Sequence, residues 1–459
     1  MNGNTIKIVA VVAVIALVAG GIGIAMYMNK PTERPDITIE SALEVYGNAD
    51  NDYKIDENDK TVIQKIIDKE DGYTKEKYPL ADADYSGEVD EEDIAVVEKI
   101  IKGEKTLVRH INHTTDTTKY PTGTYVAKTQ WPVKKFIGSG GANTLLVYEL
   151  VGVRDKIAAI NYADSSPPDK VLYSKYLEMP VVGDSTNYIY EGPLQKCLKD
   201  NDDVTAVIGF DNKNYLNGDK GLSESEIESE YHLDVIRIQH AAVDPDAYAS
   251  ALLLVGFLTQ KESKAQEVAQ WMADIYKEIS DKTKDIEKKV RVNATSYYTY
   301  LSNRNSDYAD VVVMAGGDYV LGKGAKASRY FEGTSADPAI YNTENQSDVI
   351  IALRTGSGFL KASWYDSPDN YNVANMKENL SHFSNFNAYK SGKVWHISGD
   401  MPVVARVLYS ASILYPDLFS MDYANEKHQE FVDKFLGGSY KVSDLCFVYS
   451  QQQIQEMKS

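Results

Sequence analysis

Residues 259–288, TQKESKAQEVAQWMADIYKEISDKTKDIEK, determine how the larger part of this chain is organised. Thr259 and Glu262 have the spacing of a capping box, so a helix is expected to begin here. The apolar residues that follow recur at helical spacing, at Ala265, Val268, Trp271, Met272, Ile275, Tyr276 and Ile279. A helix that continues to about Lys288 would be about 40 Å long. It would lie near the middle of residues 125–459 and would join the part before it to the part after it.

Strand and helix signals alternate on both sides of this helix. Short apolar and β-branched runs predict strands at 133–138, 156–161, 204–209, 235–238, 290–293, 311–314, 349–353 and 394–397. Such alternation is typical of α/β layers with largely parallel sheets. We therefore expect an N-lobe at about 125–258, an interlobe helix at about 259–288 and a C-lobe at about 289–459.

Charge is distributed unevenly along the 459 residues. The net charge of −19 disfavours nucleic acids and anionic membrane surfaces as partners, because like charges repel. Residues 44–103 contain 18 acidic residues and 8 lysines, so this stretch carries about half of the chain's net negative charge. Such local acidity is unfavourable unless cations neutralise it.

Two loops in the acidic stretch follow the EF-hand pattern, residues 48–59 (NADNDYKIDEND) and residues 82–93 (DADYSGEVDEED). Calcium takes about six to eight oxygen ligands, which alternate side chains and one carbonyl of such a loop can supply. The sequence therefore predicts two calcium ions. The expected ligands are Asn48, Asp50, Asp52, the Lys54 carbonyl, Asp56 and Asp59 in the first loop, and Asp82, Asp84, Ser86, the Glu88 carbonyl, Asp90 and Asp93 in the second.

The segments after the loops repeat as well, which predicts a small all-α module. Val62, Ile63, Ile66 and Ile67 return 34 residues later as Val96, Val97, Ile100 and Ile101. A solvated acidic loop would explain either loop alone, but not a tandem pair followed by matching apolar helix faces. Gly87 supplies the turn at the sixth position of the second loop, where the first loop has Tyr53.

Residues 8–28, IVAVVAVIALVAGGIGIAMYM, carry no charge over 21 positions. As a helix they would span about 31 Å, the thickness of a bilayer core, and we predict a transmembrane anchor within residues 1–30. A cleaved secretory signal is the alternative. The anchor would place the protein at the cell membrane as a single-pass protein, with the bulk of the chain extracytoplasmic. Residues 104–124, which are rich in Thr, are interpreted as a linker.

Residues 38–103 resemble a type I dockerin, the module that binds cohesin domains. The likeness rests on the two loops, on one amphipathic helix after each, and on Asp at the twelfth position. The family's partner-reading positions are Glu57, Asn58, Glu91 and Glu92 here, in place of Ser-Thr pairs. A cohesin-like partner is implied, and an intramolecular or purely structural role stays open.

Four segments of residues 125–440 resemble, in order, the iron-siderophore and cobalamin class of ABC-transporter solute-binding proteins (class III, two lobes joined by a long helix). They are KKFIGSGGANTLLVYELVGVRDKIAAI, MPVVGDSTNYIYEGPL, LTQKESKAQEVAQWMADIY and KVWHISGDMPVVARVLYSASILYPDLF. The resemblance implies a periplasmic-binding-protein-like domain, a chelated metal such as a ferric siderophore or a corrinoid as ligand, and an ABC permease with its ATPase as partners.

Ligands of open α/β sheets bind beyond the carboxyl ends of the strands. The residues expected there are Ser139, Asn143, Tyr162, Phe210, His240, Tyr297, Tyr298, Tyr300, Arg304, Arg354 and Arg406. Arginines grip carboxylates bidentately, and the tyrosines can stack on a chelate or ligate ferric iron. Taken singly, each is as easily a surface, ion-pair or structural residue.

No catalytic motif emerges from the sequence. It contains neither G-x-S-x-G nor H-E-x-x-H, so an enzyme is not expected. The function predicted is that of a membrane-anchored solute-binding protein for transport. The alternative is a calcium-dependent surface docking or scaffold protein whose large domain binds a ligand that is not transported.

Overall fold

The computed structural model describes residues 43–114, 118–139, 141–162, 169–185, 188–210, 220–239, 245–295, 300–304, 306–321, 329–330, 337–354, 364–365 and 372–458. The predicted anchor at 8–28 lies outside these residues and stays a prediction. Within the described ranges, no helix combines the length and the apolar character needed to cross a membrane.

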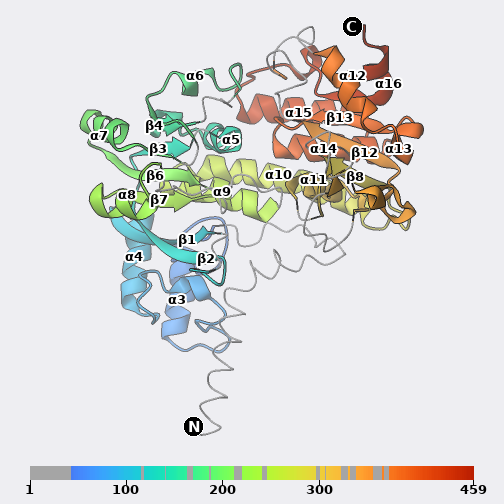
Figure 1. Cartoon of the computed structure of the whole chain (residues 1–459). Coiled ribbons are helices and arrows are strands. Elements are labelled where there is room, and N and C mark those ends of the chain that lie inside the picture. Colours follow the sequence, from blue (N-terminus) through green and yellow to red (C-terminus); the bar gives the residue numbers. More distant parts are fainter. Residues whose placement is uncertain are drawn as a thin grey trace, which may run out of the picture.

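The N-lobe is built on a five-stranded parallel sheet in the order β5-β4-β3-β6-β7 (Figure 1). Its apolar strands are covered on both faces, as in other parallel sheets. The strands are β3 (Lys135–Ser139), β4 (Ile157–Asn161), β5 (Val181–Gly183), β6 (Val204–Phe210) and β7 (Asp234–Arg237). The helices are α5 (Ala142–Val151), α6 (Ser174–Leu177), α7 (Glu191–Asp200), α8 (Glu224–Glu230) and α9 (Pro245–Leu258).

The C-lobe has a second five-stranded sheet in the order β10-β8-β12-β13-β14, parallel except for the β13–β14 pair. The strands are β8 (Arg291–Thr295), β10 (Asp318–Tyr319), β12 (Val349–Arg354), β13 (Val394–Ser398) and β14 (Val448–Ser450), beside a small antiparallel pair of β9 (Tyr300–Leu301) and β11 (Arg329–Tyr330). The helices are α11 (Asp307–Met314), α12 (Val373–Ser381), α13 (Asn387–Lys390), α14 (Val403–Leu414), α15 (Met421–Phe435) and α16 (Gln451–Glu456). Short 3₁₀ helices are η1 (Pro79–Ala81), η2 (Arg154–Lys156), η4 (Pro338–Tyr341), η5 (Thr343–Asn345) and η7 (Val442–Asp444).

The predicted strand at 311–314 is wrong, because these residues form the end of α11. The Ser306 hydroxyl caps this helix by accepting from the Ala309 amide at 3.2 Å. A short run of valines fits a buried strand and a buried helix equally well, and here the cap at Ser306 favours the helix.

The long helix expected between the lobes is α10 (Glu262–Thr283), which runs from the N-lobe to the C-lobe across the middle of Figure 1. It contacts α5 and α9 on one side and α11 and α14 on the other. The predicted capping box is not formed. Thr259 Oγ1 instead donates to the Val255 carbonyl of α9 at 2.5 Å, and α10 begins at Glu262 after a sharp corner. A Cβ added at Gly256 would lie 2.5 Å from Ala265 Cβ, so only glycine permits this close crossing of α9 and α10.

Each of the two acidic loops leads into a helix, α3 (Glu57–Ile67) or α4 (Glu91–Ile101). We call residues 43–103 the paired-loop module. Both helices begin with a capping box, formed by Asp56 with Asp59 and by Asp90 with Asp93. Ala49, Ile63, Ala81, Ala83 and Val97 form a small core between them.

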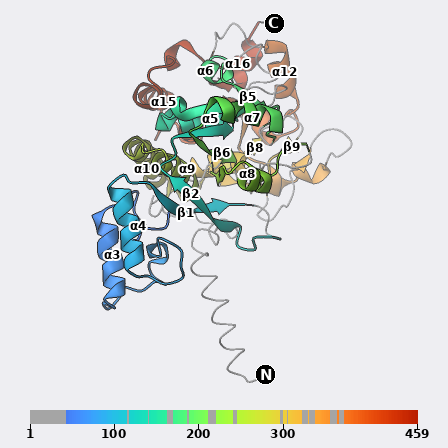
Figure 2. The same cartoon turned by 90° about the vertical axis from the view of Figure 1, so that its left-hand side faces the viewer.

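The interpretation of residues 104–124 as a linker is wrong. Residues Thr106–His113 form β1, which pairs antiparallel with β2 (Thr124–Trp131). This hairpin lies between the paired-loop module and the N-lobe (Figures 1 and 2), and Asn112 Nδ2 donates to the Val235 carbonyl of β7 at 3.0 Å. His110 and Asn112 occupy buried positions of β1, so the inward face of this strand is partly polar and the usual apolar alternation is lost.

Candidate functional site

Side chains of both lobes meet near the carboxyl ends of the two sheets. Burial raises the pKa of Tyr173, which precedes α6 of the N-lobe, and Tyr440 and Asp400 of the C-lobe act in the same direction. Tyr365 donates to the Asp400 carbonyl at 2.7 Å, and its ring lies 4.9 Å from that of Tyr440. Tyr173 of the N-lobe therefore lies near a group of polar and aromatic residues of the C-lobe.

Tyr248 and Arg406 form the polar part of this interface. Tyr248 lies on α9, is 3% exposed, and its hydroxyl has no hydrogen-bond partner among the described residues. Arg406 lies on α14, and its buried Nε likewise has no partner among them. Burial raises the pKa of Tyr248, and the nearby Arg406 guanidinium partly offsets this. Buried polar groups are nearly always paired, so this pair has hydrogen-bonding capacity left for a ligand.

Among the predicted ligand-binding residues whose side chains the structure describes, Arg406 is the one that has a buried polar atom without a partner. Asn143 and Tyr162 are partly buried beside the carboxyl ends of β3 and β4. Arg304 forms a 3.0 Å ion pair with Asp310, both largely buried, which indicates a structural role. Tyr300 lies in β9, where its carbonyl accepts from Thr295.

The other predicted residues are only partly described. Ser139, Phe210 and Arg354 end strands β3, β6 and β12 as expected, but their side chains are outside the described part of the structure. His240, Tyr297 and Tyr298 lie outside the described residues altogether. Tyr248 was not among the residues predicted from the sequence to bind a ligand. Its position as a polar side chain in the first turns of an apolar helix could have indicated it.

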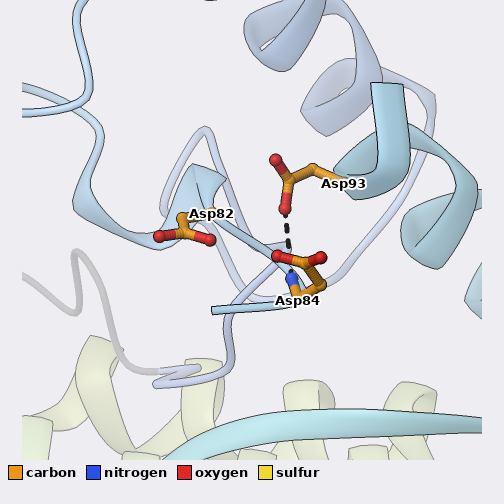
Figure 3. Close-up of side chains that lie close together, drawn as sticks. All are labelled: Asp82, Asp84 and Asp93. Atoms are coloured by element: carbon orange, nitrogen blue, oxygen red, sulfur yellow. Dashed lines mark hydrogen bonds between the residues drawn. The ribbon is translucent and has the colours of Figure 1, made fainter. Parts of the chain in front are cut away.

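The second acidic loop brings three carboxylates together (Figure 3). Oxygen atoms of Asp82, Asp84 and Asp93 all lie within 4.8 Å of one another. Asp93 Oδ1 accepts from the Asp84 amide at 3.1 Å, and burial raises the pKa of Asp93 to about 6. Gly87 adopts a φ of +105°, which favours glycine at the sixth position. Ser86 and the Glu88 carbonyl lie beside one another in the same loop, at 3.5 Å.

A lysine reaches into this second loop. Lys75 Nζ donates to Asp82 Oδ2 at 2.6 Å and to the Gly87 carbonyl at 2.5 Å. An ammonium group thus contacts the carboxylate at the first position of the loop.

The first loop is arranged around Asn48, which is fully buried. Its Nδ2 donates to the Leu43 and Asp52 carbonyls at 2.9 and 2.8 Å, and its Oδ1 has no partner in the described part of the chain. Burial raises the pKa of Asp59 to about 7. Lys54 forms an ion pair with Asp56, whose carboxylate also caps α3.

The donor set of both loops fits a hard cation. Carboxylate, amide and carbonyl oxygens are the ligands that calcium prefers. Burial, and after it the neighbouring carboxylates, raise the pKa of Asp59 and Asp93, and a bound cation would offset both effects. The buried, unpartnered Oδ1 of Asn48 lies at the first ligand position of its loop. Backbone amides position the carboxylates of Asp50 and Asp52. Asp50 Oδ1 accepts from the Asp52 amide at 3.3 Å, and Asp52 Oδ1 accepts from the Lys54 amide at 2.8 Å.

His110 and His113 of the β1–β2 hairpin have structural roles. His110 Nε2 lies 2.9 Å from Thr129 Oγ1 within the hairpin. His113 Nε2 lies 2.7 Å from Glu44 Oε2.

Comparison with solved structures agrees with this architecture. The TroA-like periplasmic binding protein FepB from Veillonella parvula superposes with a TM-score of 0.54 at 17% identity, covering 74% of this chain and 99% of that protein. The fold is that of TroA-like periplasmic binding proteins. The predicted α/β lobes with largely parallel sheets are confirmed, whereas the specific class within this fold stays a prediction.

Other solved structures are less similar. The molybdate-binding protein MolA from Haemophilus influenzae gives a TM-score of 0.49 at 16% identity, over 68% of this chain and 96% of MolA. The heme-binding protein HutB from Vibrio cholerae gives 0.43 at 13% identity, over 62% of this chain and all of HutB. Both are described as periplasmic binding proteins. No protein-family model matches the sequence, and no curated protein matches it.

Proposed function

We propose that this chain is the solute-binding protein of an ABC importer, which binds a chelated metal between its two lobes and performs no chemistry. The observation that carries the proposal is the pair Tyr248 and Arg406, whose buried hydroxyl and Nε have no hydrogen-bond partner in the described part of the chain. A guanidinium matches carboxylate and other anionic oxygens, such as those of a carboxylate siderophore or of the phosphate in a corrinoid's nucleotide side chain. The surrounding tyrosines offer apolar faces for the rest of such a ligand.

Delivery to a permease and its ATPase follows from this proposal, as does an extracytoplasmic position. The apolar segment at 8–28 supports a single-pass membrane anchor. The anchor would keep the receptor near its permease, so that released ligand is captured at a high local concentration.

We also propose that the paired-loop module binds two calcium ions through the residues described above. The buried Oδ1 of Asn48 and the three converging carboxylates of Asp82, Asp84 and Asp93 support this. Calcium would neutralise part of the charge that residues 44–103 concentrate.

A surface docking or scaffold function is the second candidate. Glu57, Asn58, Glu91 and Glu92 are all exposed at the starts of α3 and α4, where a cohesin-like partner would read them. In that case the large domain would bind a ligand without passing it to a permease.

Titration of the full chain in detergent with ferric siderophores, haem and cobalamin tests the uptake function, followed by intrinsic fluorescence. We expect at least one to bind with a Kd in the micromolar range or tighter, and Arg406→Ala to weaken binding at least tenfold. Arg291→Ala, at the amino end of β8 and therefore at the opposite end of the sheet, is the matched control and should bind normally. If none of these chelates binds, the uptake function loses its support.

A further inference from the structure

The paired-loop module is joined to the receptor through the segment that precedes its first loop. Val45 forms a β-bridge with His110 of β1, the Tyr46 amide donates to the Arg109 carbonyl at 2.9 Å, and the Ile111 amide donates to the Glu44 carbonyl at 3.0 Å. Leu43 and Val45 are fully buried and belong to the same apolar core as both lobes. The module therefore packs on the receptor and does not hang from it on a spacer.

Glu44 connects this segment to α9. Its Oε2 accepts from Ser250 Oγ at 2.9 Å and lies 2.7 Å from His113 Nε2. Ser250 stands two residues after Tyr248 on α9, the helix that brings Tyr248 to the lobe interface. The carboxylate of Glu44 thus ties the entry of the first loop to the helix that carries a proposed ligand-binding group.

The first loop itself touches the receptor at a second place. Gln266 Nε2 of α10 donates to the Tyr53 carbonyl at 3.0 Å, and Tyr53 and Ile55 pack against the main core. Asn48 connects the two contacts, because the same amide that holds the Leu43 carbonyl also holds the Asp52 carbonyl within the loop. Both α9 and α10 are therefore in contact with the first loop or its entry.

The second loop has different surroundings. Among the described residues, its hydrogen bonds stay within the module, to Lys75 and to its own backbone. Tyr85 meets the ring of Tyr46 edge to face at 5.0 Å, and α4, which begins within this loop, packs on β1 and places Ile100 in the main core. Nothing in these contacts reaches α9 or α10 directly.

We propose that calcium in the first loop, and not in the second, regulates the interlobe site by fixing α9 and α10. This inference rests on the proposed function. Asn48 offers its free Oδ1 to the ion while its Nδ2 holds Leu43, so occupancy orders Leu43 and Glu44, and Glu44 orders α9 through Ser250. Without the ion, the crowded carboxylates of Asp50, Asp52 and Asp59 repel one another and loosen these contacts. Linkage then requires that ligand and calcium strengthen each other's binding by the same factor.

Hydrogen exchange of the full chain in detergent, with calcium or with EGTA, tests this without a ligand. Exchange of α9 amides (Pro245–Leu258) should be about tenfold slower in calcium for the wild type. Asp50→Ala should abolish the difference, whereas Asp84→Ala, its counterpart at the third position of the second loop, should keep it. The double variant Ser250→Ala and Gln266→Ala should keep calcium-dependent protection of residues 48–59 but lose that of α9.

Three results would overturn the inference: α9 exchange that ignores calcium in the wild type, equal loss in Asp50→Ala and Asp84→Ala, or full α9 protection in the double variant. Titration with ferric siderophores and haem then separates the two proposals. Equal affinity of a binding probe in calcium and in EGTA contradicts the regulation and leaves the proposed function standing. A normal α9 response with no probe bound contradicts the proposed function and leaves the coupling of the first loop to α9 standing.

Discussion

The loops at 48–59 and 82–93 follow one sequence pattern, yet the structure surrounds them differently. The first is held by α10 at Tyr53 and by α9 through Glu44, and its Asn48 is fully buried. The second keeps its hydrogen bonds within the module and receives the ammonium of Lys75 at Asp82. A repeat therefore predicts that two sites share a chemistry, but not that they share a role. The role depends on which site packs against the rest of the molecule.

The strongest test of this comparison removes one ligand from each loop. Asp50→Ala should remove most of the calcium-dependent stability of the lobes, about 3 kcal/mol at calcium concentrations some hundredfold above Kd. Asp84→Ala should lower the calcium-dependent stability of the lobes by well under 1 kcal/mol. Thermal unfolding followed by tryptophan fluorescence reports this difference, because all four tryptophans lie outside the paired-loop module. A larger loss in Asp84→Ala would reverse the assignment of roles.

The contact between Glu44 and His113 gives the first loop a pH dependence. Its partner Glu44 raises the pKa of His113, even though burial opposes this, and His113 lowers the pKa of Glu44. A histidine whose pKa is higher in the folded state than in the unfolded state stabilises the fold at pH values below the unfolded pKa. This stabilisation is lost as the pH rises through the folded pKa. His113→Gln should therefore destabilise the protein by about 1–2 kcal/mol near pH 6 and much less above pH 8.

Urea unfolding of wild type and His113→Gln across this pH range measures the difference between them. Burial lowers the pKa of His110 to about 4. Its contribution to the pH dependence of stability is common to the two proteins and cancels in the comparison. A difference that stays constant from pH 6 to pH 8 would show that the charge of His113 is not involved.

Two glycines sharpen the comparison through the backbone. Gly47, just before the first loop, has a φ of +102° and a substituted Cβ would lie 3.3 Å from Val97, whereas Gly87 has a φ of +105° and open space around it. Replacement by alanine strains the backbone at both, by roughly 1–3 kcal/mol. Gly47→Ala should be the more destabilising by about 1 kcal/mol, as measured by chemical unfolding, and the opposite order would contradict the packing described for the first loop.

The smallest effect is expected at Lys75. Its ammonium contacts Asp82 at 2.6 Å, so it competes with a cation for the second loop. Lys75→Ala should raise calcium affinity there by about three- to tenfold and leave the first loop unchanged. Isothermal titration calorimetry distinguishes the two sites, and a gain at the first loop instead would place the competition elsewhere.

The sequence predicts those features that depend on local periodicity. The long helix, seven of the eight strands and the helices after both loops follow from apolar spacing, because side-chain period and burial agree there. The strand predicted at 311–314 is wrong because a run of three valines shows neither the alternation of a strand nor the spacing of a helix. Strand β1 was missed because polar His110 and Asn112 are its inward residues, and the cap expected at Thr259 is replaced by a bond to Val255.

The candidate site was less predictable. Arg406 was found because it follows a strand at the expected edge, but Tyr248 comes to the interface only through the corner between α9 and α10. The contacts of Glu44 with Ser250 and of Tyr53 with Gln266 join residues about 200 positions apart. Neither the spacing nor the composition of the module contains that information, so the sequence leaves open whether the module docks a partner or has an intramolecular role.

Scanning calorimetry of the full chain, in calcium and in EGTA, tests most directly whether the module and the receptor form one unit. We predict that the module and the lobes unfold together and that EGTA lowers their common transition by roughly 5 °C. A module transition that moves by itself, while the transition of the lobes stays at the same temperature, would contradict this account.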